Sequence, residues 1–433
     1  MANDNPANRA GYHVTRLPNG ATVVLRPMPH VESASIGLWI RAGGRYETSS
    51  LSGVSHFIEH LLFKGTRTRT CEELKQAIEG VGGSLNAFTA EEFTCYMAKV
   101  PAKHFSRAIT ILSDMVRHPR FYPSDIRKER EVILEEIRMY DDTPAQYVHD
   151  LFNQLLWPNH PLGNLLSGTA RTVNQINRRD LLGYWKRMYH ARNLVISCAG
   201  AFDPELVLTR LRARFGTMAS GSLPRFSPAP RPKRGPQVHV LRKTTEQAHV
   251  CLGTPAIPRT HPGRYALELL HVVLGANMSS RLFREVREKR GLVYEIGTHI
   301  KRYKDTGAFV VYAGCDVGKL PTTIRTVIEE LSQMSRQPIA AQELRRAKEF
   351  YQGQLLMGLE DTMEHMLWMG EQVITVDRVA SAHDLVKDLE RVTPRDIQRA
   401  ARAHFTPRRT FLAVIGQVPE QDALALRRLC VPT

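Results

Sequence analysis

Two histidines and a glutamate stand close together in the segment His56-Phe57-Ile58-Glu59-His60. If this segment is helical, rotation by about 100° per residue places the three polar side chains on one face, opposite the apolar residues. Two histidines four residues apart can bind one metal ion, and Glu59 then lies near the open side of that ion. The pattern therefore predicts a metal site at which a bound water is activated and a carboxylate takes its proton.

The surrounding residues favour a helix. Ser52 stands where an N-cap is expected, and Gly65 stands where a helix would stop. Apolar residues recur at helical spacing through the stretch, namely Val54, Phe57, Ile58, Leu61 and Leu62. Histidines on half-apolar helices also occur without any metal, and this inverted His-x-x-Glu-His order needs a third ligand from elsewhere in the chain.

A second helix is predicted over residues 126–137, which contain no glycine or proline and follow Pro123-Ser124-Asp125. Glu129 and Glu136 are seven residues apart and therefore lie on one face of this helix. One of them could be the third metal ligand while the other orients a histidine through its second ring nitrogen. The helix also carries Glu131 and Glu135, and the spacing alone does not choose among the four carboxylates.

The histidine motif followed by Glu136 resembles the insulinase/pitrilysin family of zinc metallopeptidases with the inverted motif. Two further segments are similar to that family: Gly83–Tyr96, which resembles its substrate-binding edge strand and the neighbouring strand, and Ser279–Tyr294, which resembles a segment carrying an arginine and a tyrosine. The resemblance runs from about Tyr12 to the C-terminal region. In layout the chain is closest to bacterial two-domain peptidases that resemble the beta subunit of the mitochondrial processing peptidase.

The resemblance implies a role for each matching residue. One Zn²⁺ per chain would be held by His56, His60 and Glu136, with Glu59 as the general base. Glu129 would orient a histidine ligand. An extended peptide would pair with the edge strand at Asn86, Ala87, Phe88 and Thr89. Arg287 and Tyr294, from the second half, would donate hydrogen bonds to the substrate backbone or to the oxyanion.

Composition agrees with a soluble enzyme. The chain has 433 residues, of which 42% are hydrophobic and 24% charged, and no apolar run approaches the roughly 20 residues of a membrane span. The net charge of +16 is spread through segments that also carry acidic residues, without a nucleic-acid-binding motif. The six cysteines are scattered, which is typical of a reducing compartment. We therefore expect neither a nucleic-acid nor a membrane partner, and a location in the bacterial cytoplasm or, as the alternative, the mitochondrial matrix.

The order of predicted elements is repeated along the chain. A strand, a helix, a turn and a second helix between Phe93 and Arg130 recur after Phe309, with Ala347 and Gln354 in the places of Glu129 and Glu136. The second copy thus keeps the fold pattern without the metal ligands. We predict a catalytic domain at 1–218, a Pro/Ser/Gly-rich linker at 219–236 and a homologous domain without metal at 237–433.

Each domain is predicted to have an α+β fold, in which a mainly antiparallel sheet carries helices on one face. The family resemblance implies two such α/β-roll domains that enclose a cavity like a clamshell. The predicted function is a zinc-dependent endopeptidase or oligopeptidase that hydrolyses unstructured peptides. The alternatives are the catalytic subunit of a processing peptidase that needs a partner and, ranked last, an inactive scaffold. Because the metal ligands and the Arg/Tyr pair stand in one chain, the self-sufficient enzyme is favoured, and a homodimer is left open.

Overall fold

The computed structural model describes residues 11–232 and 235–430, which fold into two compact units. The first unit comprises residues up to Ile137 together with Leu165–Ser227 and Leu356–Ala382. The second comprises Arg138–Asn164, Pro228–Leu355 and the chain from His383 onward. No helix in these described ranges combines the length and the apolar character that a bilayer span requires.

The first unit is built on a six-stranded sheet in the order β1-β2-β6-β3-β5-β4. Neighbouring strands are antiparallel, except that β2 and β6 are parallel. The strands are β1 (His13–Arg16), β2 (Thr22–Pro27), β3 (Ser33–Ile40), β4 (Ser84–Thr89), β5 (Thr94–Pro101) and β6 (Leu194–Gly200). Its helices from this part of the chain are, in order, α2 (Val54–Leu62), α3 (Cys71–Glu79), α4 (Phe105–Arg117), α5 (Pro123–Asp141), α7 (Ala170–Gln175), α8 (Arg178–Met188) and α9 (Pro204–Phe215).

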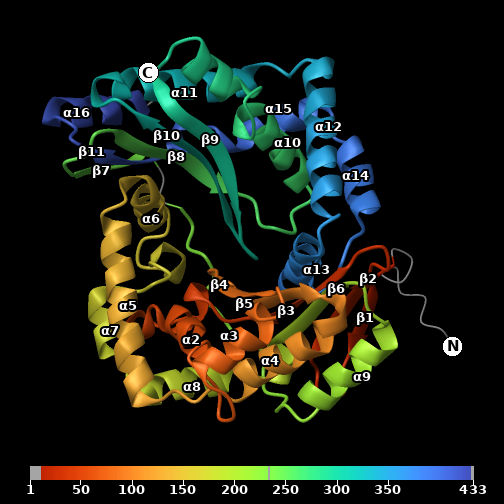
Figure 1. Ribbon diagram of the computed structural model, residues 1–433. Helices are drawn as coiled ribbons and strands as arrows, with labels where there is room; N and C mark the ends of the chain where they lie inside the picture. The colour runs from red at the N-terminus through yellow and green to blue at the C-terminus, as the bar shows by residue number, and fades with distance from the viewer. Residues whose placement is uncertain (1–10, 233–234, 431–433) are drawn as a thin grey trace. The chain divides into compact units, whose positions relative to one another are not determined.

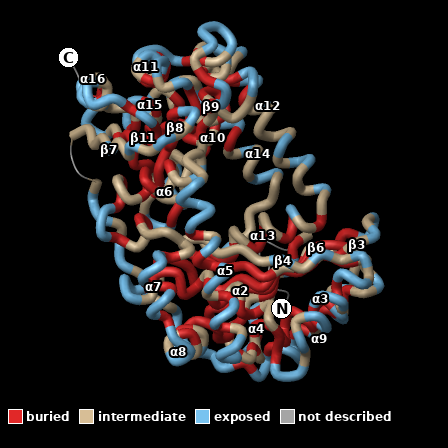
Figure 2. The backbone as a smooth tube through the Cα atoms, turned by 60° about the vertical axis from the view of Figure 1, so that its left-hand side comes forward, coloured by how far each residue is buried: buried red, intermediate tan, exposed pale blue. Residues whose placement is uncertain are grey.

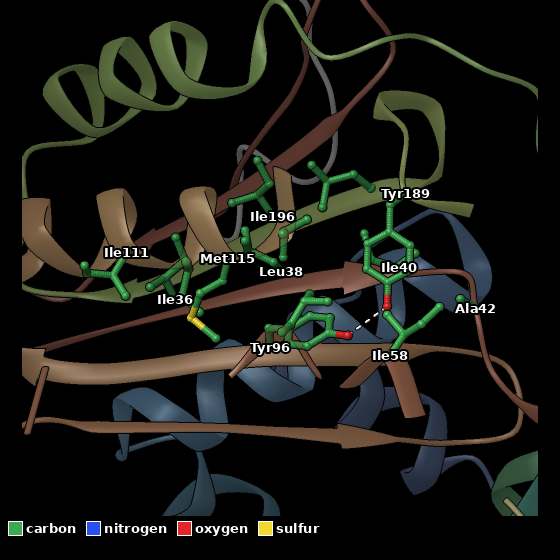
Figure 3. Packing of buried hydrophobic residues seen from close by; sticks show 14 of the residues in the cluster. Ile36, Leu38, Ile40, Ala42, Ile58, Tyr96, Ile111, Met115, Tyr189 and Ile196 are labelled. Atoms are coloured by element: carbon green, nitrogen blue, oxygen red, sulfur yellow. Dashed lines mark hydrogen bonds between the residues drawn. The ribbon is translucent and has the colours of Figure 1, made fainter. Parts of the chain in front are cut away.

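The main core of this unit lies between the sheet and these helices. Alternate residues of β3, such as Ile36 and Leu38, point toward Met115 of α4 (Figure 3). Ile58 of α2 belongs to the same core and is fully buried. Burial of one face of α2 therefore fixes the direction in which its opposite face, with the two histidines, must point.

The second unit is built on a five-stranded sheet in the order β7-β11-β8-β10-β9, with β7 and β11 parallel. Its strands are β7 (Gln237–Arg242), β8 (Ala248–Ala256), β9 (Val293–Arg302), β10 (Gly307–Cys315) and β11 (Phe411–Gly416). Its helices include α10 (Arg264–Gly275), α11 (Leu320–Arg336), α12 (Ala341–Gly358), α14 (Ala382–Glu390), α15 (Pro394–His404) and α16 (Glu420–Cys430). Figure 2 shows the buried segments concentrated along the strands and the helices packed on them, whereas α12 and α14 consist mainly of intermediate and exposed residues.

The predicted duplication is confirmed by the topology. In both sheets one parallel pair is followed by three antiparallel pairs, and β1 is an additional edge strand of the first. Ala347 and Gln354 lie in α12, the counterpart of α5, so the second copy lacks two carboxylates that α5 provides.

Two helices are exchanged between the copies. Helix α6 (Pro144–Leu156) precedes the linker but packs on the second sheet, where Phe152 contacts the cluster around Val310. Helix α13 (Thr362–Val376) comes from the second copy but packs on the first sheet, with Met366 in the cluster around Trp39. The compact units therefore differ from the predicted continuous domains 1–218 and 237–433, because sequence order does not specify which sheet face an apolar helix covers. The expected α+β fold stands, with one exchanged helix added on the second face of each sheet.

Candidate metal centre

Helix α2 carries both histidines, and its first turn is held by a residue that the sequence analysis missed. The N-cap is Gly53, with φ +93° and no side-chain cap. The buried Glu47 carboxylate accepts hydrogen bonds from the backbone N–H groups of Gly53 at 2.7 Å and Ser55 at 2.8 Å. The prediction that Ser52 caps the helix is therefore wrong. The predicted stop is also late, since the helix ends at Leu62, before Gly65.

The three predicted ligands converge on one point. His56 Nε2 lies 3.3 Å from His60 Nε2, and the Glu136 Oε2 atom lies 3.7 Å and 3.6 Å from these two nitrogens. Ligands about 2.0–2.1 Å from a tetrahedral zinc ion are separated by about 3.3–3.4 Å. The observed triangle is within a few tenths of an ångström of that arrangement, so these side chains fit a zinc ion with one position left for water.

The histidines differ in their environment. Burial, with a smaller contribution from His60, lowers the pKa of His56 to about 3, so this ring is neutral and has a free lone pair. Burial alone would lower the pKa of His60, but the hydrogen bond with Glu129 and the nearby carboxylates outweigh it and raise that pKa. A metal ion would compete with this proton for the ring nitrogen.

Glu129 contacts His60 through Nδ1, the ring nitrogen that is not part of the ligand triangle. Its Oε2 atom lies 3.2 Å from His60 Nδ1, and its Oε1 atom pairs with Lys64 Nζ at 2.7 Å. Burial opposes the charge of Glu129, but hydrogen bonds from His60 and Lys64 hold its pKa below the ordinary value. Glu129 and Glu136 thus occupy the two positions that the sequence left open. Glu131 and Glu135 are exposed on the same helix.

Glu59 lies beside the ligands without belonging to the triangle. Burial raises the pKa of its carboxyl group, and the Thr89 hydroxyl donates a hydrogen bond to its Oε2 atom. A carboxyl group with a raised pKa is a better proton acceptor than an ordinary one at neutral pH. Lys64 pairs with Glu129, and Glu47 bonds the first turn of α2. Neither residue belongs to a motif in the sequence, so neither contact was predicted.

The four predicted substrate-binding residues lie on β4, which, in the part of the chain that the structure describes, pairs with β5 alone and forms the sheet edge. Asn86 is exposed, and its Oδ1 atom accepts a hydrogen bond from the Ala87 backbone N–H at 2.8 Å. The Phe88 ring packs edge-on against Trp39, with 5.9 Å between centroids. Thr89 reaches Glu59. An edge strand offers the unpaired backbone groups that strand addition requires.

Arg287 and Tyr294 belong to the second unit, whereas the metal ligands belong to the first. Arg287 lies in a π-helical turn, Phe283–Glu288, a type of turn that is frequent at functional sites. Its guanidinium group lies 5.5 Å from the centroid of the Tyr294 ring. Tyr294 is 76% exposed, so its hydroxyl group is open to a ligand.

Comparison with known proteins identifies the family. Residues 22–170 match the family model described as insulinase (peptidase family M16), and residues 175–351 match the model described as the peptidase M16 inactive domain. The chain belongs to the M16 insulinase family of peptidases. A Streptomyces coelicolor relative named an uncharacterized zinc protease is 38% identical, with 95% of this chain and 91% of the relative covered. A Bacillus subtilis relative with the same description is 35% identical, with 90% and 94% covered.

Solved structures agree with this fold. A protease from Helicobacter pylori superimposes with a TM-score of 0.87 at 20% identity, covering 94% of this chain and 99% of that one. A Pseudomonas fluorescens structure described as a peptidase M16 inactive domain gives the same TM-score at 17% identity, covering 94% and 98%. The metal ligands and Glu59 fall within the segment matched by the insulinase model, and Arg287 and Tyr294 within the segment matched by the inactive-domain model.

Proposed function

We propose that this protein is a zinc-dependent peptidase that hydrolyses extended, unstructured peptides. The observation that carries the proposal is the triangle of His56, His60 and Glu136 with Glu59 beside it. The relatives named zinc proteases support the metal and the reaction class. We further propose one zinc ion per chain.

The chemistry that zinc supplies at such a site is a bound water whose pKa is lowered toward 7. Glu59 would accept a proton from the water that attacks the peptide carbonyl, and it would pass that proton to the leaving amine. The Thr89 hydroxyl, which donates to Glu59, holds the carboxylate in one orientation. Glu129 keeps the Nε2 atom of His60 directed at the ligand triangle through its bond to Nδ1.

For substrate binding we propose strand addition along β4 at residues 86–89. Main-chain pairing uses hydrogen bonds to the backbone of the peptide. It therefore selects extended peptides, and the affinity depends little on their side chains. Arg287 and Tyr294 are proposed to donate hydrogen bonds to the substrate backbone or to the developing oxyanion. Their proximity to each other and the exposure of Tyr294 support a shared role.

Two other functions remain as alternatives. A catalytic subunit that needs a partner would bind zinc but turn over peptides only with that partner, and an inactive scaffold would do neither. The presence of every ligand, Glu59 and the Arg/Tyr pair in one chain favours the self-sufficient enzyme. A bacterial cytoplasmic location, and the absence of nucleic-acid and membrane partners, are part of the same proposal, and a homodimer is left open.

Hydrolysis of a quenched fluorescent unstructured peptide tests the proposal. We expect cleavage by the native protein, loss of cleavage after chelation, and recovery when one equivalent of zinc is restored. Mass spectrometry of the products should show cuts inside the peptide. Stoichiometric zinc without turnover would instead support the partner-dependent subunit, and failure to bind zinc would contradict the proposal.

A further inference from the structure

The second unit contains a cavity of about 650 Å³ whose described lining includes none of the metal-site residues. It lies among the loop before α10, the first turn of α10, the segment after α14, and α15; α10 and α15 run close together in Figure 1. Pockets that bind small molecules have volumes of about 300–1,000 Å³. The cavity is therefore large enough for a ligand of several residues' size.

Much of the cavity wall is apolar. Ile257, Val392, Ala400 and Ala403 line it and offer only hydrocarbon side chains. Val392 and Ala400 are half-buried, so a ligand placed against them would remove apolar surface from water. This wall favours a ligand with an apolar body.

The charged side chains of the lining leave one cation in excess. Asp388 pairs with Arg391 at 3.2 Å, and Asp396 pairs with Arg399. Arg264 has no carboxylate partner among the described residues. It donates to the Tyr265 hydroxyl at 2.7 Å and lies 4.3 Å from the centroid of that ring. The Arg264 guanidinium thus carries the excess positive charge of the lining, and one excess cation favours a ligand with a single anionic group.

The first turn of α10 also favours an anionic ligand. Its N-cap is Gly263, no side chain caps the helix, and the first turn contains no acidic residue. Tyr265 and Ala266 of this turn are buried and line the cavity. The backbone N–H groups of Gly263 and Arg264 already bond His261, at 3.0 Å and 3.1 Å. The positive end of the helix dipole is therefore what favours an anion beside the Arg264 side chain.

His404 supplies a hydrogen-bond acceptor, in contrast to the donor groups of Arg264. It is only 4% exposed, lines the cavity, and its Nδ1 atom is bonded to the Pro255 carbonyl at 3.1 Å. Burial lowers the pKa of His404, so the ring is neutral and Nδ1 carries the donated proton. Nε2 is then a hydrogen-bond acceptor at the cavity, and it can receive an N–H or O–H donor from a ligand.

We propose that this cavity binds an N-acylated apolar amino acid, either free or as the carboxyl-terminal residue of a peptide. The carboxylate would lie at Arg264 and the first turn of α10, and the apolar side chain would lie on the Val392 and Ala400 wall. The amide N–H would donate to His404 Nε2. The site is an exosite in the second unit and does not depend on peptidase activity.

Isothermal titration of the full chain with N-acetyl-leucyl-leucine tests the proposal. We expect binding that is at least about tenfold weaker for the methyl ester, which lacks the charge, and for decanoate, which lacks the amide donor. Arg264→Gln should weaken binding by a similar factor, whereas Arg395→Gln, which removes an exposed arginine of α15 that does not line the cavity, should change it little. Ala400→Phe should block the cavity, with an unchanged circular dichroism spectrum and a cooperative thermal transition showing that the variant is folded.

Two further arms separate the outcomes. A decapeptide with the same carboxyl-terminal residues that binds as tightly as the dipeptide identifies peptide ends as the ligand, and weaker binding of the decapeptide identifies the free acylated amino acid. Glu136→Gln should leave the affinity unchanged. Equal affinity for acid, ester and decanoate, or loss of binding in Glu136→Gln with no effect of Arg264→Gln, would overturn the proposal.

Discussion

At the scale of single residues, the metal site depends on the roles that four glutamates take around two histidines. Glu136 contributes to the ligand triangle, Glu129 holds His60 from behind, Glu59 lies beside the triangle, and Glu47 holds the start of the helix. The sequence predicted the first three through the motif and the family resemblance. Glu47 escaped prediction because its contact with α2 depends on the path of the intervening loop.

Replacing Glu136 with glutamine should weaken zinc binding by more than about a hundredfold. The amide oxygen carries no charge, and loss of a direct ligand should cost more than the 10–100-fold typical of residues that only orient a ligand. Competition with a chromophoric chelator measures the affinity. Glu135→Gln is the matched control, since Glu135 is the exposed neighbour on the same helix. Equal affinity in the two variants would remove Glu136 from the ligand set.

Glu129→Gln should weaken zinc binding by about 10–100-fold, because the glutamine cannot balance positive charge on His60 as the carboxylate does. The same competition experiment applies, with Glu131→Gln as the control because Glu131 is exposed. If zinc affinity is unchanged in Glu129→Gln, the contact with His60 serves packing alone.

At the scale of elements, α2 is held from two sides. Its apolar face is buried in the main core of the first unit, and its first turn is bonded to Glu47. The helical pattern of apolar residues predicted the first of these. The second could not be predicted, since Ser52 was the expected cap and the contact of Glu47 with the first turn depends on the path of the loop between them.

Glu47 should make stability depend on pH. Burial raises its pKa to about 7 in the folded state, above the ordinary value of 4.5, so the folded protein holds this proton more tightly than the unfolded chain. The resulting stabilisation is fully present below about pH 4.5 and is lost as the pH rises through 7. Compared with Glu47→Gln, the chelator-treated native protein should lose about 3 kcal/mol of unfolding free energy across this window in urea titrations. A difference between the two proteins that does not vary with pH would contradict this role.

At the scale of the whole molecule, the chain contains two copies of one fold, and one helix from each copy packs on the sheet of the other copy. The repeated order of elements along the chain and the missing carboxylates of the second copy follow from the sequence pattern. The exchange does not, because the apolar faces of α6 and α13, with Val148 and Phe152 in one and Met366 and Met369 in the other, carry no signal that specifies one sheet. Local pattern predicts that a helix is buried but not against which partner.

Cutting the chain at the linker should therefore damage both copies. A fragment of residues 1–218 lacks α13, so the sheet face that carries Trp39 and Val195 is left uncovered. We expect this fragment to aggregate or to unfold at a lower denaturant concentration, and co-expression with residues 219–433 to restore a soluble complex that binds zinc. Size-exclusion chromatography and zinc quantification measure both effects. A fragment 1–218 that is monodisperse and as stable as the full chain would contradict the importance of the exchange.

The most direct test of the central claim compares peptide turnover by the native protein and by Glu59→Gln at equal, measured zinc occupancy. Glutamine keeps the size of the side chain but cannot accept the proton of the attacking water. We expect both proteins to hold one zinc per chain and kcat to fall by at least about a hundredfold in the variant. Undiminished turnover by zinc-loaded Glu59→Gln would show that the water is activated by another group, and the assignment of Glu59 as the base would be wrong.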